Sequence, residues 1–376
     1  MRSLARIDLD AVTANVRVLD ELAGAAQVMA VVKADGYGHG LLPSARAALT
    51  GGATWLGVAF LEEALALRAA GLDAPVLAWL STPGEDLAPA VTAGVDLGVY
   101  DESGLIRVAA AAREAGRPAR VQLKVDTGLS RGGTRPEAWP ALCVAAARAE
   151  ADGAVRVTGV WSHFAHADGG ADHPVTLRQA AVFAEALAVA DQTGLRPDVR
   201  HLANSAGTLT APATHYDLVR PGLAVYGLSP LPQLGRPADF GLRPVMSLRS
   251  HVALVKRVPA GAGVSYGHRY TTAAETTVAL VPLGYADGVP RAGTNLLEVM
   301  LGGRRRRVAG TVCMDQFVLD LGDDAVSEGD EVLLFGPGDD GEPTAQDWAE
   351  ALGTINYEVV TRIGSRVPRD YVGGAG

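Results

Sequence analysis

The chain has 376 residues, of which 48% are hydrophobic and 20% are charged, a composition that excludes a disordered protein and allows one large domain plus a smaller one. Its formal net charge of -9 disfavours nucleic-acid binding, because phosphate contacts need a basic face. The only basic cluster is the run Arg304 to Arg307, which we expect to form the turn of an exposed hairpin.

The sequence carries no targeting or metal-binding pattern. Its N-terminal stretch does not resemble a signal peptide, and no run reaches the ~20 apolar residues of a membrane helix. We therefore expect a cytoplasmic protein without a membrane span. The two cysteines, Cys143 and Cys313, are expected to be reduced thiols, and no spacing of Cys and His indicates zinc or another metal.

Eight apolar, β-branched runs recur in the first two thirds of the chain, each followed by a segment with helical periodicity. We expect a (βα)8 TIM-type barrel, since eight such units occupy about 225 residues. An open doubly wound sheet is the main alternative, but no GxGxxG turn follows the first run. The expected strands are residues 28–33, 55–60, 74–80, 95–100, 120–126, 156–164, 199–205 and 218–227.

After Pro237 the pattern changes to short strand-like runs separated by glycine and proline. This change predicts a barrel domain over residues 1–237 and a mainly β domain over residues 238–376. One helix is expected in the second domain at residues 345–353, with Thr344 as its N-cap.

Polar residues occur where the expected barrel strands end. The active sites of such barrels lie at the carboxyl ends of the strands. A single strand-end cation usually reaches solvent, and a single histidine is usually a core residue. Because these residues would all meet at one rim, we expect a functional site containing Lys33, Tyr37, Arg131, His163, Asn204, Ser205 and Arg220.

Small residues at the seventh and eighth strand ends favour a phosphate, which barrels of this class often bind there. The residues are Asn204, Ser205 and Gly222. A lysine in an apolar pocket has a lowered pKa and forms a Schiff base with an aldehyde. Lys33 together with a phosphate site therefore predicts pyridoxal 5'-phosphate as the cofactor.

A family resemblance joins these observations. In chain order, the motifs AVVKADGYGHG, LKVDTGLSRGG, WSHFAHAD, HLANSAG, VRPGLAVYG, VSYG, PLGYADG, CMDQ, INYEVVTRI and RVPRDYV resemble the alanine racemase family along nearly the whole chain. The resemblance implies a homodimer, arranged head to tail, that interconverts L-alanine and D-alanine. It also implies a supply of D-alanine for cell-wall peptidoglycan.

The resemblance implies a role for each matching residue. Lys33 would hold the cofactor and act as one catalytic base, and Tyr266 would act as the other. Arg131 and Met314 would bind the substrate carboxylate. The remaining expected positions are Tyr37, Asn204, Ser205, Gly222 and Tyr357 around the phosphate, Arg220, His163 and His201 at and behind the pyridine nitrogen, and Lys124, Tyr285 and Asp315 in support.

Lys124 has two interpretations, because strand alternation places it on the same barrel face as Asp126 and a buried ammonium needs a partner. Similar enzymes carry a carbamylated lysine at the matching position, where the carbamate would fix Arg131. The other interpretation is an ion pair between Lys124 and Asp126.

Other functions of the same fold predict different residues. A decarboxylase of this architecture would place an acidic residue near the pyridine nitrogen, where this chain has Arg220. A non-catalytic pyridoxal phosphate carrier would lack the second domain with VSYG and CMDQ. A racemase of broader specificity, acting also on serine, stays open, because GLSRGG and Thr311 differ from the commoner versions of those loops.

Overall fold

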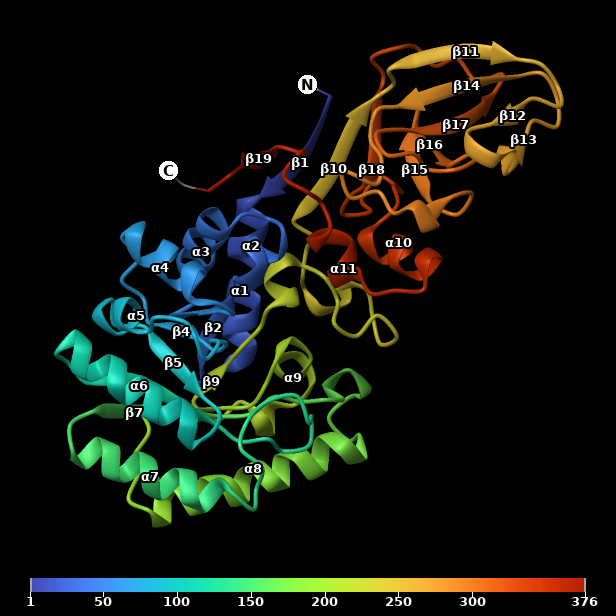
Figure 1. Ribbon diagram of the computed structural model, residues 1–376. Helices are drawn as coiled ribbons and strands as arrows, with labels where there is room; N and C mark the ends of the chain where they lie inside the picture. Colours follow the sequence, from blue (N-terminus) through green and yellow to red (C-terminus); the bar gives the residue numbers. More distant parts are fainter. Residues whose placement is uncertain (1, 375–376) are drawn as a thin grey trace.

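The first part of the chain forms a barrel of eight parallel strands surrounded by helices (Figure 1). The computed structural model describes residues 2–374. Every ladder in this sheet is parallel, and the strands are almost fully buried because helices cover them. In spatial order the strands are β8 (Val199–His201), β7 (Val155–Trp161), β6 (Ala119–Lys124), β5 (Asp96–Val99), β4 (Val76–Ala78), β3 (Trp55–Val58), β2 (Gln27–Val31) and β9 (Leu218–Val219).

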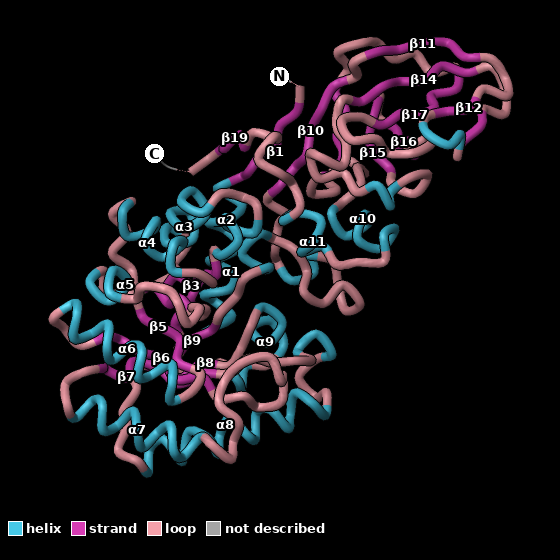
Figure 2. The backbone as a smooth tube through the Cα atoms, viewed as in Figure 1, coloured by secondary structure: helices cyan, strands magenta, loops and turns pink. Residues whose placement is uncertain are grey.

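The barrel closes between β8 and β9. An isolated parallel bridge pairs Asn204 with Arg220, and the amide of Arg220 donates a 2.9 Å hydrogen bond to the carbonyl of Ala203. Figure 2 shows the helices around these strands. They are α1 (Leu9–Ala23), α2 (Lys33–Tyr37), α3 (Leu41–Thr50), α4 (Leu61–Ala69), α5 (Ala88–Thr92), α6 (Glu102–Ala115), α7 (Trp139–Ala151), α8 (Pro174–Gln192) and α9 (Ser205–Thr210).

All eight barrel strands lie within the expected runs or overlap them, so the predicted fold class is confirmed. The strands are shorter than the runs, and the last one differs most. The run 218–227 contains only the two residues of β9, and the rest forms a turn and the 3-10 helix η3 (Leu223–Tyr226). Pro221 has no amide hydrogen for a ladder, which ends the strand there.

The second part of the chain is mainly β. Its largest sheet contains β16 (Arg304–Arg307), β15 (Glu298–Leu301), β18 (Glu331–Phe335), β10 (Met246–His251), β1 (Ser3–Asp8) and β19 (Arg369–Val372), in that order. A smaller sheet contains β11 (Leu254–Val258), β14 (Thr276–Val281) and β17 (Phe317–Gly322), and β12 (Gly263–Val264) pairs with β13 (Tyr270–Thr271). The expected mainly β character is confirmed.

The first strand of the chain belongs to this second sheet. Strand β1 pairs antiparallel with β10 and parallel with β19, so both ends of the chain meet beside the β-rich part (Figure 1). Residues 3–8 therefore precede the barrel in the sequence but extend the other sheet. The domain boundary expected after residue 237 stays a prediction.

The run Arg304 to Arg307 corrects one expectation. It forms strand β16 and not a turn; the turn of this hairpin lies at Gly302 and Gly303, which both have positive φ. Acidic neighbours neutralise the run, since Arg304 and Arg306 pair with Asp324. The basic cluster is therefore part of a paired strand.

Two helices complete the second part. Helix α10 (Ala345–Leu352) begins at the expected N-cap, where the hydroxyl of Thr344 accepts a 3.1 Å hydrogen bond from the amide of Asp347. Helix α11 (Asn356–Thr361) carries Tyr357 to the barrel. Across residues 2–374, no helix combines the length and apolar character needed to cross a membrane.

Candidate active site

A cavity of about 580 Å³ lies at the carboxyl ends of the barrel strands. It brings together residues that are far apart in the sequence, as the strand-end pattern predicts. Among its described lining residues there are four basic side chains and no carboxylate, so the cavity suits an anionic ligand. The expected site residues that line it are Lys33, Tyr37, Lys124, Arg131, His163, Asn204, Ser205, Arg220, Gly222 and Tyr357.

Lys33 lies two residues beyond β2, where the chain turns sharply. Ala34 and Asp35 have positive φ values of 53° and 52°, and Glu63 accepts a 2.6 Å hydrogen bond from the amide of Ala34. Burial lowers the pKa of the Lys33 amine, and the cationic Arg131 lowers it further, against a smaller opposing effect of Glu63. The neutral amine, which is the nucleophilic and basic form, is therefore more populated at Lys33 than at an exposed lysine at the same pH.

Arg220 follows β9 and is held by a dense set of acceptors. Its guanidinium donates to Nδ1 of His201 at 2.9 Å, to Nδ1 of His163 at 3.2 Å and to the carbonyl of Ser162 at 2.7 Å. Burial and the Arg220 charge lower the pKa of both histidines well below the usual range, so both are neutral. Burial also lowers the pKa of Arg220 to about 9, which still leaves a cation at neutral pH.

Two tyrosines, a serine and a glycine meet at the other end of the cavity. The hydroxyl of Ser205 accepts a 2.9 Å hydrogen bond from the amide of Gly222, and a Cβ atom at Gly222 would overlap the Tyr37 hydroxyl. The ring centroids of Tyr37 and Tyr357 lie 6.3 Å apart. Burial raises the pKa of Tyr37 above its usual range and raises the pKa of Tyr357 to about 12, so both phenols keep a proton that they can donate.

Lys124 lies against aromatic rings. Its Nζ is 4.6 Å from the ring centroid of Trp161 and 5.1 Å from that of Tyr100. Burial, followed by the charges of Arg131 and Arg220, lowers the pKa of Lys124 to about 8. The ion pair with Asp126, one of the two interpretations, is absent from the described residues: Asp126 instead accepts the amides of residues 128–130.

Four expected residues lie outside this cavity, on the β-rich part. The side chains of Tyr266, Met314 and Tyr285 are 74%, 52% and 43% exposed. Asp315 forms a 2.8 Å ion pair with Arg366. None of these residues lines the cavity that contains Lys33, so the chain presents one half of the expected catalytic set in the cavity and the other half on an exposed surface.

Hydrogen bonds connect the short loops on which these four residues lie. The hydroxyl of Thr311 donates a 2.7 Å hydrogen bond to the carbonyl of Tyr266, and the amide of Tyr285 donates at 3.0 Å to the carbonyl of Cys313. Gly284 allows this close approach, because a Cβ atom there would overlap the backbone of Cys313 and Met314. Hydrogen bonds and close backbone packing therefore fix the conformation of the loops around Tyr266.

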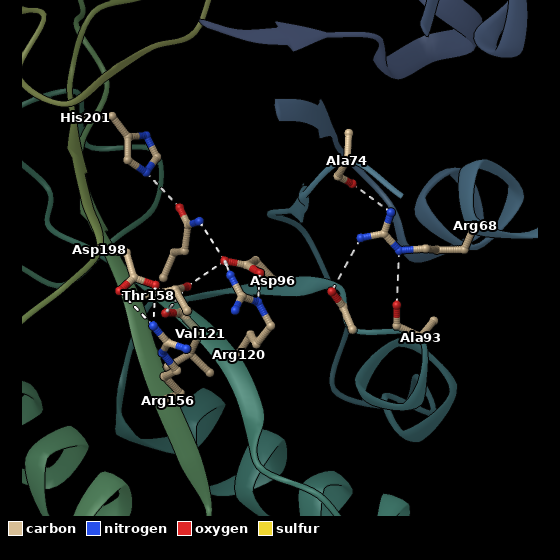
Figure 3. A network of polar contacts seen from close by, with 12 residues as sticks. Arg68, Ala74, Ala93, Asp96, Arg120, Val121, Arg156, Thr158, Asp198 and His201 are labelled. Carbon is tan, nitrogen blue, oxygen red and sulfur yellow. Dashed lines mark hydrogen bonds and ion pairs between the residues drawn. The ribbon is translucent and has the colours of Figure 1, made fainter. Parts of the chain in front are cut away.

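Sequence reasoning missed the aromatic walls of the cavity and the polar residues behind His201. The ring of Trp161 lies parallel to His201 at 5.7 Å and 5.1 Å from the Arg220 guanidinium. Behind His201, Gln122 and Asp96 continue a chain of hydrogen bonds that Figure 3 shows from His201 to Asp96. A carboxylate and an amide within apolar strands were the available signals.

Comparison with known proteins gives matches along nearly the whole chain. Residues 7–230 match the family model for the N-terminal domain of alanine racemase, and residues 245–371 match that for the C-terminal domain. The alanine racemase of Frankia casuarinae is 65% identical over 372 residues, which cover 99% of this chain and 97% of that protein. That of Thermobifida fusca is 62% identical over 369 residues, 98% of each chain. The alanine racemase structure from D-cycloserine-producing Streptomyces lavendulae superimposes with a TM-score of 0.98 at 56% identity and covers 100% of this chain and 98% of its own.

Proposed function

The chain belongs to the alanine racemase family, and from this premise we propose that it interconverts L-alanine and D-alanine with pyridoxal phosphate held by Lys33. The observation that carries this proposal is the cavity at the strand ends. It combines a lysine of lowered pKa with three further basic side chains, and its described lining contains no carboxylate. Supply of D-alanine to peptidoglycan synthesis is part of the same proposal.

The residues of the cavity fit the chemistry of this cofactor. Tyr37 and Tyr357 keep donor protons, and Gly222 leaves the space in which an anion can approach Ser205 and the two phenols. Lys33 offers the amine that would bind the cofactor's aldehyde carbon. Arg220, which directly follows β9 and lines the same cavity, offers a hydrogen-bond donor for the ring nitrogen.

When bound, the cofactor withdraws electrons from the substrate Cα atom and makes the α-hydrogen acidic. Lys33 would then remove or return this proton on one face of Cα, since its lowered pKa favours the neutral amine. Arg220 would leave the ring nitrogen without a proton, because a guanidinium donates hydrogen bonds and cannot accept them. Arg131 would hold the negative charge of the substrate carboxylate.

Racemisation needs a second base on the opposite face of Cα, and we propose Tyr266 for this role. Its 74% exposure and its absence from the cavity of its own chain support a head-to-tail homodimer, in which each subunit places Tyr266 and the backbone of Met314 in the cavity of the other. Tyr285 and Asp315 would support that surface.

Two other functions of this fold are less well supported. A decarboxylase would need an acidic group near the ring nitrogen, whereas the surroundings of Arg220 are two neutral histidines and backbone carbonyls. A non-catalytic carrier would have no use for the ordered, exposed surface around Tyr266.

The proposal is tested with the purified protein. We expect a visible absorption band from lysine-bound pyridoxal that disappears on borohydride reduction, and a polarimetric change when L-alanine or D-alanine is added. L-serine is the control for substrate breadth. Protein that binds pyridoxal phosphate but releases carbon dioxide from amino acids, or changes no alanine, contradicts the proposed reaction.

A further inference from the structure

A chain of buried hydrogen bonds runs from Arg220 away from the cavity to a carboxylate inside the barrel. Arg220 donates to Nδ1 of His201 at 2.9 Å, Nε2 of His201 lies 2.7 Å from Oε1 of Gln122, and Nε2 of Gln122 lies 2.9 Å from Oδ2 of Asp96. Asp96, Gln122 and His201 are completely buried and Arg220 is 4% exposed. Figure 3 shows the two ends of the inner segment, His201 and Asp96.

The barrel leaves space for these hydrogen bonds to cross from one strand to another. Gln122 belongs to β6 and His201 to β8, so the amide must cross the intervening strand β7. At the crossing point β7 has Gly159, where a Cβ atom would lie 2.8 Å from the Gln122 amide group. A larger residue at this position would displace Gln122, which makes the contact with His201 depend on the glycine.

The chemistry of Arg220 and Asp96, the two ends of this series of hydrogen bonds, decides which atom donates in each bond. A guanidinium only donates, so Nδ1 of His201 must be the bare, accepting nitrogen. An ionised carboxylate only accepts, so Gln122 must turn its NH2 group to Asp96 and its oxygen to His201. Nε2 of His201 must then carry the proton, and both ends require the same tautomer.

Asp96 is fixed so that it can impose this direction. Its Oδ1 accepts a 2.5 Å hydrogen bond from Nε of Arg120, and its Oδ2 accepts a 2.5 Å hydrogen bond from the hydroxyl of Thr158 (Figure 3). Nη2 of Arg120 also lies 3.4 Å from Oδ2. A guanidinium can only donate, so both oxygens of Asp96 are acceptors and Gln122 must present its NH2 group to Oδ2.

We propose that Asp96 and Gln122 are positioning residues that keep the proton of His201 on Nε2 and thereby hold the Arg220 guanidinium at the cavity. Neither residue lines the cavity, and both act through His201. The position of the proton on His201 depends only on this series of hydrogen bonds and not on the proposed reaction. Its effect on racemisation rests on the proposed function, in which Arg220 faces the cofactor ring.

The substitution Asp96→Asn tests this proposal. It keeps the size and shape of the side chain but replaces an accepting carboxylate oxygen with a donating NH2 group. Arg120 would hold the amide oxygen of the new side chain, so the NH2 group would face Gln122. Gln122 would then turn its oxygen toward residue 96 and its NH2 group toward His201. Nε2 of His201 would have to accept, and its proton would move to Nδ1, where it opposes the donor of Arg220.

The primary readout is the ring ¹⁵N spectrum of full-length protein labelled at histidine, since protonated and bare ring nitrogens resonate far apart. The chain has eight histidines, so His201 can be assigned from its own substitution. We expect the Nε2–H form in the unchanged protein and a new Nδ1–H population in Asp96→Asn. The matched control is Thr158→Val, which removes a donor to Asp96 but leaves the carboxylate facing Gln122, and should keep the Nε2–H form.

The double substitution Asp96→Asn with Gln122→Glu moves the carboxylate one residue along the chain. The carboxylate introduced at position 122 would accept from both the new amide at position 96 and Nε2 of His201, which restores the tautomer without restoring Asp96. We expect kcat to fall about 100-fold in Asp96→Asn, in line with a misplaced active-site group, and to recover to within about tenfold in the double variant.

The outcomes separate this proposal from the proposed function. An Asp96→Asn protein that keeps only the Nε2–H form, or a double variant that folds with Nδ1–H, overturns the positioning role. If Asp96→Asn does not fold, the double variant alone decides between the two results. Spectra that change as expected in a protein without racemase activity support the positioning role and contradict only the proposed reaction.

Discussion

The hydroxyl of Ser205 accepts a hydrogen bond from the amide of Gly222 at 2.9 Å, which joins the ends of β8 and β9 at the point where the barrel closes. The same hydroxyl accepts a 3.3 Å hydrogen bond from the amide of Ala224. Closure of the barrel and the proposed phosphate site therefore share residues. Small side chains are required here by geometry, since Tyr37 fills the space beside Gly222.

We predict that Gly222→Ala weakens binding of pyridoxal phosphate with little backbone strain. Gly222 has a φ of -113°, which alanine adopts easily, so the expected effect comes from the overlap of the new Cβ atom with the Tyr37 hydroxyl. Displacing a packed side chain costs about 1–3 kcal/mol, and a cost of that size raises the Kd about 5- to 160-fold. Gly84→Ala is the control, because nothing lies within 4 Å of its Cβ position; fluorescence titration measures both, and equal Kd values contradict the prediction.

Lys33→Ala should abolish racemisation and remove the visible band of lysine-bound cofactor. The chain has three lysines, Lys33, Lys124 and Lys256, so a label fixed by borohydride can be located without ambiguity by peptide mapping. We expect the label on the peptide that contains Lys33, whose buried amine has a lowered pKa. A label found on Lys124 or Lys256 would reassign the catalytic lysine.

The pKa of Lys124 predicts a pH-dependent reaction with carbon dioxide. Its pKa of about 8 lies below the usual 10.5, so the neutral amine increases as the pH rises through about 8. Only the neutral amine adds to carbon dioxide, forming an N–C bond and releasing a proton. At constant carbon dioxide pressure with a ¹³C label, we expect a carbamate signal that grows across this range and is missing in Lys124→Met. A protein without such a signal contains Lys124 as a free amine.

The barrel strands could be predicted because parallel strands covered by helices are buried on both faces and therefore read as continuous apolar runs. Strand β1 has the sequence SLARID, in which buried and partly exposed residues alternate. Its partners β10 and β19 lie more than 230 residues further along the chain. Such pairing is set by contacts between segments far apart in the sequence, which local periodicity does not report.

The site could be predicted for residues at strand ends, because the topology brings those ends together whatever the exact register. The roles of Gln122 and Asp96 could not be predicted. Their hydrogen bond depends on which side chains cross the barrel interior and on the space that Gly159 leaves. Tyr266 was predicted from family resemblance alone, and its exposed position explains why spacing within one chain could not place it near Lys33.

The junction between the two parts predicts a difference between two glycines with nearly equal backbone angles. Gly227 and Gly116 have φ values of 68° and 66°. A Cβ atom at Gly227 would overlap the carbonyl of Arg243, whereas nothing lies within 4 Å of the position at Gly116. We expect Gly116→Ala to lower the free energy of unfolding by about 1–2 kcal/mol from backbone strain alone, and Gly227→Ala by clearly more. Urea denaturation measures both, and equal losses would mean that the junction can relax.

Tyr266→Phe should remove one base and leave the cofactor attached, because Tyr266 lies outside the cavity that contains Lys33. Net racemisation should slow equally in both directions, since the equilibrium constant is unchanged. Isotope exchange separates the two faces of Cα. If Lys33 acts on D-alanine and Tyr266 on L-alanine, the variant keeps α-deuterium exchange from D-alanine and loses it from L-alanine. The loss should be about 10²- to 10⁴-fold, the size of general-base catalysis.

Mixing this variant with Lys33→Ala tests the dimer as well. If Tyr266 acts in the partner's cavity, each mixed dimer has one site with both bases and one site with neither, so mixing two inactive proteins should restore activity. Subunit exchange is first demonstrated with differently tagged chains, and Tyr266→Phe mixed with itself is the control. Exchanged mixtures without activity would place Tyr266 in the site of its own chain, and equal exchange from both enantiomers would remove it as the second base.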